Sequence, residues 1–262
     1  MHSHLTEKEI ADSIKYASNI QAALLPDVDY FKRLLPDSFI LNLPRDVVSG
    51  DFYWISKFQN RIAITAADCT GHGVPGAFMS IMGINFMNQI TSYCIPSANK
   101  ILNQLREYVM KALHQTGMAG EQKDGIDMSL CVIDTETRMI EFAGANSPLF
   151  YFSNGELKEI KGDRMPIGVS PLEEESFTRH LLKLDEVDSF YIFSDGYSDQ
   201  FGGENYKKLK MKGFREIIKS LHGKKIGKQV EILINELEDW KGNNRQIDDI
   251  LVLGIGLDSF KL

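Results

Sequence analysis

Two hairpin patterns in the middle of the chain constrain its fold more than any other feature. Short apolar runs at residues 128–133 and 138–142 are separated by four polar residues, and runs at 149–152 and 157–160 flank Asn154-Gly155. Asn-Gly favours the tight turn of a two-stranded hairpin. Hairpins join antiparallel strands, whereas parallel strands need long crossover connections. The middle of the chain is therefore expected to form antiparallel sheet.

Apolar periodicity predicts the remaining elements on either side of these hairpins. We expect strands at 39–43, 51–57, 61–66, 178–184, 190–193 and 250–257, and helices at 5–25, 77–90, 98–114, 214–221 and 228–240. The helix at 77–90 is apolar almost all round, so we expect it to be buried. Hairpins in place of regular β-α-β alternation favour an α+β fold, in which two antiparallel β-sheets pack face to face and helices flank them.

The segment 71–76 reads Gly-His-Gly-Val-Pro-Gly and lies between a predicted strand and a predicted helix. This spacing matches the dinucleotide-binding fingerprint, in which the start of the helix holds a diphosphate. Two observations oppose that interpretation. Asp68 places a negative charge beside the diphosphate, and no acid follows it before Glu107, although the fingerprint needs one about 20 residues on. A carboxylate at a strand end beside a glycine turn suits a cation better.

Four aspartates share one position, at the end of a predicted apolar strand: Asp51, Asp68, Asp195 and Asp248. Asp249 stands beside the last of them. Unpaired carboxylates next to a core are costly, and a cluster of them repels itself. One or two Mg²⁺ or Mn²⁺ ions would relieve both effects, because these ions prefer oxygen ligands.

The alternative interpretation of a single aspartate beside a turn is that it only forms the turn. It applies to each of these four residues taken alone, and equally to Asp46, Asp134 and Asp163. Sequence alone does not show whether the four carboxylates converge.

Composition excludes several classes of protein. A net charge of −7 argues against a general nucleic-acid binder. No apolar run approaches the roughly 20 residues that a membrane helix needs, and no charged-then-apolar leader opens the chain. Cys69, Cys94 and Cys131 are far apart and odd in number, which indicates a reducing compartment, so we expect a cytoplasmic protein. None has an arginine at the sixth position after it, as cysteine-dependent phosphatases require.

Five segments together resemble the bacterial branch of the metal-dependent protein phosphatase 2C superfamily: SGDFYW, ADCTGHGVPGAFMS, GANSPL, FSDGYSD and QIDDILVLGI. That branch is typified by the sporulation stage II E phosphatase and by phosphatases that regulate stress sigma factors. The resemblance runs from about residue 46 to residue 256, with the motifs in the family's order. It implies a Mn²⁺- or Mg²⁺-dependent protein serine/threonine phosphatase, a hydrolase that acts in signal transduction.

The resemblance also implies a role for each strand-end aspartate. Asp68 would bridge two Mn²⁺ or Mg²⁺ ions, and the backbone carbonyl of Cys69 would be a ligand to one of them. Asp195 and Asp248 would hold the other ion, and Asp51 would bind directly or through metal-held water. A water between the ions, its pKa lowered by them, would attack the phosphorus of a phosphoserine or phosphothreonine.

The chain departs from the superfamily pattern in two places. Ordinary members have Asp-Gly-His with the histidine proposed as general acid, whereas two extra residues separate Asp68 from His72. His72 is therefore either that acid or a histidine that shapes the glycine turn. Trp54 stands where many members carry an acid, so an outer acid of the metal site is absent here.

Two further residues are candidates on the same resemblance. Asp163 is a candidate ligand for a weaker third metal, and Arg45 is a candidate for holding the substrate phosphate. The alternative for both is a solvated loop residue.

We expect an N-terminal linker helix at residues 1–26 and a phosphatase domain at residues 27–262. Thr6 and Glu9 form a capping box, and Pro26 stops the helix. Ile10, Ala17 and Leu24 recur every seven residues. The helix is a coiled coil that forms a homodimer, an amphipathic helix packed on its own domain, or the end of a signalling helix from an upstream sensor domain.

The resemblance favours a phosphorylated anti-sigma-factor antagonist as substrate, and the segment SIKYASNIQAALLP resembles the linker that joins such domains to sensors. The alternative from a different class is a catalytically silent relative that binds a phosphoprotein or another partner. The presence of all four aspartates argues against that alternative.

Overall fold

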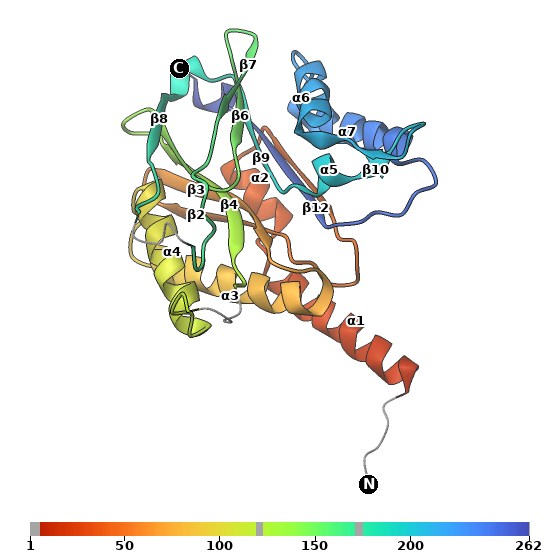
Figure 1. Cartoon of the computed structure of the whole chain (residues 1–262). Helices are drawn as coiled ribbons and strands as arrows, with labels where there is room; N and C mark the ends of the chain where they lie inside the picture. The colour runs from red at the N-terminus through yellow and green to blue at the C-terminus, as the bar shows by residue number, and fades with distance from the viewer. Residues whose placement is uncertain (1–5, 119–122, 171–174, 262) are drawn as a thin grey trace.

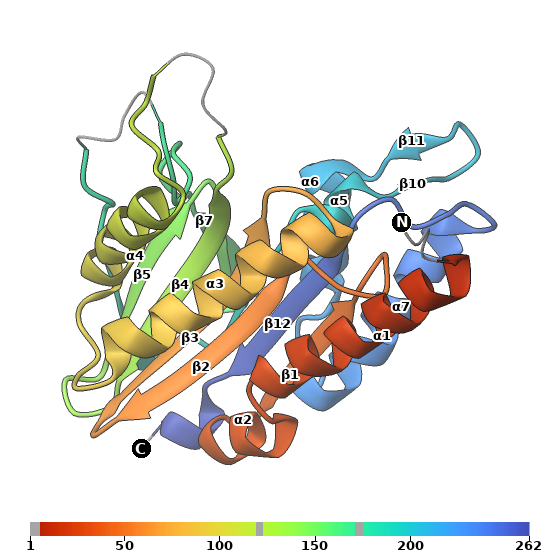
Figure 2. The ribbon, with the colours of Figure 1, turned by 90° about the horizontal axis from the view of Figure 1, so that it is seen from below.

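The computed structural model describes residues 6–118, 123–170 and 175–261. In this part of the chain, two five-stranded sheets lie face to face, and helices lie on their outer sides (Figures 1 and 2). Both sheets are antiparallel throughout. The α+β architecture expected from the hairpins is therefore confirmed, and the doubly wound parallel sheet of a dinucleotide-binding fold is excluded.

One sheet is formed, in spatial order, by β2 (Phe52–Phe58), β3 (Arg61–Cys69), β4 (Ile126–Asp134), β5 (Met139–Ala145) and β8 (His180–Lys183). Helices α3 (Gly73–Thr91) and α4 (Ala98–Ala112) cover its outer face (Figure 2). In the register of β3 and β4, Asp68 lies opposite Asp127. This pairing brings two acids together at one end of the sheet.

The other sheet has the order β1 (Ser38–Leu43), β12 (Ile250–Gly256), β9 (Ser189–Phe193), β6 (Leu149–Ser153) and β7 (Glu156–Ile160). Helices α6 (Lys210–Ser220) and α7 (Ile226–Lys241) pack outside it (Figure 1). The segment between β9 and α6 contains the short α5 (Gly196–Asp199), β10 (Phe201–Gly202) and β11 (Lys207–Lys208). Single 3-10 turns follow β8 at Leu184–Glu186 and β12 at Asp258–Phe260.

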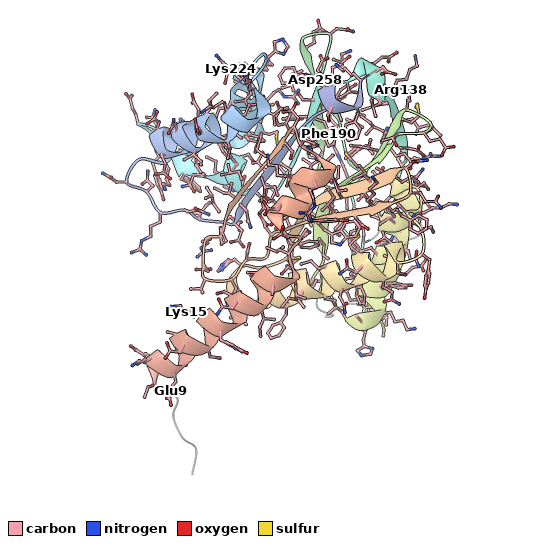
Figure 3. All side chains as sticks on the ribbon, turned by 180° about the vertical axis from the view of Figure 1, so that it is seen from behind. Glu9, Lys15, Arg138, Phe190, Lys224 and Asp258 are labelled. Atoms are coloured by element: carbon pink, nitrogen blue, oxygen red, sulfur yellow. The ribbon has the colours of Figure 1, made fainter. Side chains whose placement is uncertain are left out.

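The core lies in three apolar layers that alternate with the two sheets. Ile64, Ile133 and Phe190 belong to the layer between the sheets, where Figure 3 shows Phe190 inside the molecule. The second layer lies between α3, α4 and their sheet, and the third between α6, α7 and theirs. Each fully buried large side chain contributes roughly 1.5–3 kcal/mol of stability. The layers hold the ends of both sheets in fixed positions.

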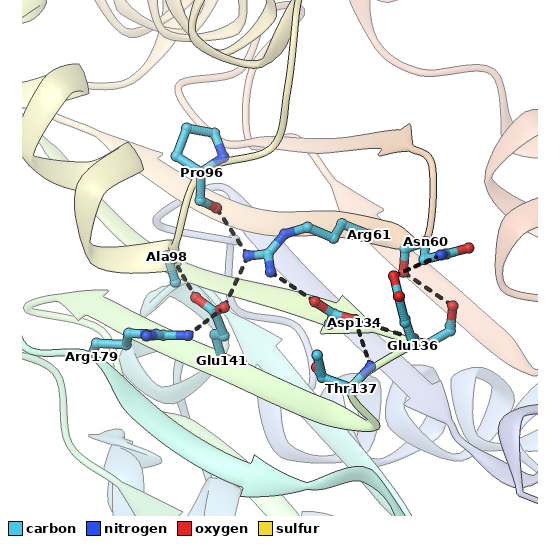
Figure 4. A network of polar contacts seen from close by, with 10 residues as sticks. Asn60, Arg61, Pro96, Ala98, Asp134, Glu136, Thr137, Glu141 and Arg179 are labelled. Atoms are coloured by element: carbon cyan, nitrogen blue, oxygen red, sulfur yellow. Dashed lines mark hydrogen bonds and ion pairs between the residues drawn. The ribbon is translucent and has the colours of Figure 1, made fainter.

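An ion-pair network centred on the buried Glu141 joins the first sheet to the start of α4 (Figure 4). Glu141 is only 2% exposed and accepts hydrogen bonds from Arg61 at 2.9 Å, from Arg179 at 2.7 Å and from the Ala98 amide at 2.9 Å. Arg61 also pairs with Asp134 at 2.9 Å. The charged partners hold the pKa of Glu141 below its usual range against the effect of burial. The network lies at the opposite end of β3 from Asp68.

Helix α1 (Glu7–Leu24) begins at the expected capping box of Thr6 and Glu9. Leu5, the first residue of the predicted helix, lies outside the described residues. The N-terminal part of α1 stands out from the body of the molecule, as Glu9 and Lys15 show in Figure 3. A second helix, α2 (Val28–Leu34), which the periodicity did not predict, follows with Asp27 as its N-cap. None of the helices in the described ranges is long and apolar enough to cross a membrane.

Helix α3 differs from the expectation of full burial. It begins at Gly73, four residues earlier than predicted, and its inner face is buried. Its first turns are open to solvent, with Phe78 71% exposed and Val74 41% exposed. Apolar residues all round a helix therefore do not mean burial here, because no described element covers this outer face.

Candidate functional site

An acidic cavity of about 240 Å³ opens where the two sheets meet at one end. The residues that line it are Asp68, Cys69, Thr70, Gly71, His72, Asp127, Asp195 and Asp248. Four of these eight carry carboxylates, and no lysine or arginine is among the described residues of the lining. The cavity is therefore strongly negative.

Each sheet supplies two of the cavity's carboxylates. Asp68 is the penultimate residue of β3, and Asp127 faces it from β4. From the other sheet, Asp195 follows β9 as the N-cap of α5, and Asp248 comes two residues before β12. The packing of the sheets thus brings together acids that are up to 180 positions apart in sequence, from Asp68 to Asp248.

Glycines permit the close approach of the loops around the cavity. A methyl group at Gly76 would overlap the carbonyl oxygen of Gly71 and lie 2.8 Å from the Cα of Gly50. Gly71 has φ +83°, a left-handed conformation that glycine adopts at little cost. The glycines of this segment therefore serve a turn from Asp68 into α3.

Asp51 lies behind the acidic cavity rather than in its lining. It directly precedes β2, its side chain is 3% exposed, and its Oδ2 has no hydrogen-bond partner among the described residues. Burial raises the pKa of Asp51 well above its ordinary value, Ser194 opposes the shift by hydrogen bonding, and the charges of Asp249, Asp248 and Asp195 add to it. A buried, unpartnered carboxylate oxygen is costly unless a cation or proton compensates it.

Burial raises the proton affinity of all four cavity carboxylates, and neighbouring negative charges add to it for Asp68, Asp195 and Asp248. Burial, followed by the charges of Asp51, Asp195, Asp248 and Asp127, raises the pKa of Asp68 to about 10. Burial also raises the pKa of Asp195, Asp248 and Asp127. Clusters of buried groups with such shifts are typical of functional sites.

The adjacent residues Asp248 and Asp249 have different roles. Asp248 faces the cavity, whereas Asp249 is 3% exposed and accepts hydrogen bonds from the backbone amides of Arg45 at 2.7 Å and Gly50 at 2.8 Å. Asp249 therefore fastens the loop before Asp51 to the start of β12. Its carboxylate is fully engaged in this structural contact.

The donor set of the cavity fits a hard divalent cation in kind. It consists of carboxylate oxygens and the backbone around Cys69, whose thiol is kept protonated because burial raises its pKa. Within residues 6–118, 123–170 and 175–261, no three His, Cys, Asp or Glu side chains are gathered closely enough to hold a metal ion as they stand. The carboxylates nevertheless lie near enough to influence one another's pKa values.

The remaining predicted residues have different positions. His72 lines the cavity and its Nδ1 lies 3.1 Å from Asp46 Oδ2. Arg45 lies near enough to lower the pKa of Asp248 and has its side chain 4.0 Å from Asp46. Asp163 is not among the described lining residues, and its carboxylate accepts hydrogen bonds from the amide and hydroxyl of Thr178.

Asp127 is the cavity residue that the sequence analysis missed. Its carboxylate accepts a 2.8 Å hydrogen bond from Asn146, and it stands immediately before the apolar run at 128–133. This is the position that Asp51 takes before its own strand, so the same pattern could have found it. Asp127 follows Ile126, whereas Asp51 follows Gly50 and Asp248 stands beside Asp249.

Helix α1 is hydrogen-bonded to the loop that carries Asp51. Gln21, its one buried residue in the described part, donates to the Ser49 carbonyl at 2.6 Å and to the Ser80 hydroxyl at 2.8 Å. Its Oε1 accepts from the Ser49 amide at 3.0 Å, and the Ser49 hydroxyl accepts from the Asp51 amide at 3.1 Å. Ile10 and Leu24, two members of the heptad pattern, are exposed.

Comparison with known proteins shows the class. In structure the chain is similar to the SiaA-PP2C domain of Pseudomonas aeruginosa, with a TM-score of 0.84 and 31% identity over 96% of this chain and 98% of that chain. The structure of RsbX in complex with magnesium shares the fold, with a TM-score of 0.57 and 17% identity over 84% of this chain and 94% of that one. The domain is therefore of the PP2C phosphatase type.

The sequence comparisons identify the family. Stage II sporulation protein E (SpoIIE) is the family that matches, over residues 59–258. The chain is also 25% identical over 197 residues to phosphoserine phosphatase RsbU of Bacillus subtilis (strain 168), which is 74% of this chain and 55% of RsbU. It thus spans about half the length of that relative. The chain belongs to the SpoIIE family of PP2C-type serine phosphatase domains.

Proposed function

We propose that the chain is a Mn²⁺- or Mg²⁺-dependent protein serine/threonine phosphatase whose active site is the acidic cavity. The observation that carries the proposal is the convergence of carboxylates from both sheets on one cavity, with their pKa values raised and no lysine or arginine in the described lining. RsbU is named a phosphoserine phosphatase, and RsbX was solved with magnesium. A phosphoserine phosphatase and a magnesium-binding relative both agree with a site for phosphate chemistry that is lined by carboxylate oxygens.

Two ions would be held by Asp68, Asp195 and Asp248 with the backbone carbonyl of Cys69. Asp51 would bind directly or through metal-held water. When bound, such ions supply a water of lowered pKa and neutralise the charge of the phosphate. Asp127 is a further acid at the same cavity and is available to the same site. Bound cations would offset the cost of burying these carboxylates, and burial is the largest cause of their raised pKa values.

Two further residues, Arg45 and His72, would help to orient the substrate at the cavity. Asp249 accepts hydrogen bonds from the backbone amides of Arg45 and Gly50, and so holds the loop before Asp51 against β12. The side chain of Arg45 is close enough to the cavity to lower the pKa of Asp248. That side chain is a candidate for holding a phosphate oxygen. His72 is half exposed at the mouth of the cavity. It would either donate a proton to the leaving serine oxygen or shape the glycine turn through its contact with Asp46.

The substrate we propose is a phosphorylated protein of the anti-sigma-factor antagonist kind, met in the cytoplasm. Helix α1 would connect the domain to an upstream sensor or pair with a second copy, since its exposed Ile10 and Leu24 have no covering element in the described part. Gln21 of α1 is hydrogen-bonded to Ser49, and the Asp51 amide is hydrogen-bonded to the Ser49 hydroxyl, so a movement of α1 would be transmitted to Asp51.

The test is hydrolysis of p-nitrophenyl phosphate and of a phosphoserine peptide, with Mn²⁺, Mg²⁺ or chelator. We expect metal-dependent turnover that is abolished by Asp195→Asn and kept by Asp258→Asn, a matched change at an exposed site elsewhere (Figure 3). Turnover that survives chelator or Asp195→Asn contradicts the mechanism. Metal binding without turnover of either substrate indicates the silent relative instead.

A further inference from the structure

An exposed apolar surface lies on the first turns of α3, beside the acidic cavity. It consists of Val74, Pro75 and Phe78, which we call the α3 apolar rim. Residues three and four apart share one face of a helix, so Phe78 stands directly above the other two. Phe78 is 71% exposed, while its neighbours Ala77 and Met79 are buried. Because Phe78 is exposed at this position, its aromatic side chain adds little buried apolar area to the core.

The rim is continuous with the cavity. His72, which lines the cavity, is the N-cap of α3, and Val74 is two residues further on. A methyl group built on Gly71, another lining residue, would lie 3.9 Å from the Cβ of Pro75. Gly71, His72, Val74, Pro75 and Phe78 are all exposed, so they form one surface from the cavity mouth outward.

We propose that the α3 apolar rim selects protein substrates by binding a large aliphatic side chain close to the phosphoserine. The inference rests on the proposed function and adds a specificity determinant to it. The described cavity lining contains no lysine or arginine that could hold acidic residues around the phosphoserine. The α3 apolar rim offers exposed apolar area at the edge of this lining, where a substrate side chain can be removed from water.

The geometry sets where that aliphatic residue belongs in the substrate. Phe78 is six positions after His72, which is about 9 Å along a helix that rises 1.5 Å per residue. An extended peptide advances about 3.3 Å per residue, so this distance corresponds to roughly three residues. The preferred side chain is expected two to four positions from the phosphoserine, on one side of it only.

The experiment uses phosphoserine peptides that are identical except for leucine or serine at one position, scanned from four before to four after the phosphoserine. We expect the wild type to favour leucine at one or two of the predicted positions by about tenfold in kcat/KM. Phe78→Ser should reduce that preference to within about twofold, because its contact area is lost. Tyr93→Ser is the matched control, since Tyr93 is 89% exposed beyond the other end of α3.

The outcomes separate this inference from the proposed function. Turnover of p-nitrophenyl phosphate, which is too small to reach Phe78, should stay within about twofold of wild type in Phe78→Ser. No leucine preference at any position, or a preference that survives Phe78→Ser, overturns the rim while leaving the phosphatase intact. A dimer in light scattering that Phe78→Ser dissociates also overturns it, because a second copy would then cover the rim. Absence of all hydrolysis instead contradicts the proposed function.

Discussion

Replacing Asp68 by asparagine is expected to change how the stability of the metal-free protein depends on pH. In the fold, burial and then the neighbouring charges raise the pKa of Asp68 to about 10, from an ordinary value of 3.8. Between these two values the folded protein keeps a proton that the unfolded chain has released. The free energy of unfolding therefore falls as pH rises through this interval.

The magnitude follows from the proton count. A difference of one bound proton changes the free energy of unfolding by about 1.4 kcal/mol per pH unit, so by about 2.7 kcal/mol from pH 6 to pH 8. Asparagine carries no proton that can be lost, so Asp68→Asn should remove this contribution.

Urea unfolding in the presence of chelator at pH 6, 7 and 8 measures the effect, with Asp258→Asn as control. We expect the wild type and the control to lose stability with rising pH, and Asp68→Asn to lose about 2.7 kcal/mol less over that range. Added Mn²⁺ should stabilise the wild type increasingly as pH rises, because the ligands must be ionised to bind it. Parallel pH profiles for wild type and Asp68→Asn would refute the reasoning.

Three further changes test how the site is supported. Gln21→Leu removes three hydrogen bonds that hold α1 to Ser49, so we expect the Mn²⁺ concentration for half-maximal activity to rise about tenfold; an unchanged titration contradicts a link from α1 to Asp51. Glu141→Gln should lower the free energy of unfolding by roughly 3 kcal/mol, measured in urea, because it leaves two arginines short of their buried partner; a loss below about 1 kcal/mol contradicts this. Gly196→Ala should abolish Mn²⁺-dependent turnover, because its methyl group would overlap the Asp249 carbonyl, whereas Gly227→Ala has open space and should keep turnover and gain up to about 1 kcal/mol.

Much of the fold follows from local patterns in the sequence. The hairpin at Asn154-Gly155 forms as predicted, because the turn chemistry and the alternating runs agree. The two-sheet architecture then follows from the number of antiparallel runs. Helix α2 was not predicted, because its seven residues are too few to show a helical period. The solvent exposure of Phe78 was not predictable either, because apolar periodicity does not show which elements pack against a helix.

The candidate site was predictable in its residue types and only partly in its geometry. Strand-end position identified Asp68, Asp195 and Asp248, which the two sheets bring to one cavity. The pattern could not separate Asp248 from Asp249, because that depends on which carboxylate meets the amides of Arg45 and Gly50. Nor could it place Asp51 behind the cavity, because the path of the loop before β2 is set by contacts distant in sequence.

The central claim is that the acidic cavity holds divalent ions on Asp68, Asp195 and Asp248. Anomalous diffraction from crystals soaked in Mn²⁺ tests it most directly. We predict two peaks in the cavity, both within about 2.2 Å of an Asp68 oxygen, with Asp195 and Asp248 drawn in as further ligands. No anomalous peak there, or a peak whose ligands exclude Asp68, would contradict the account.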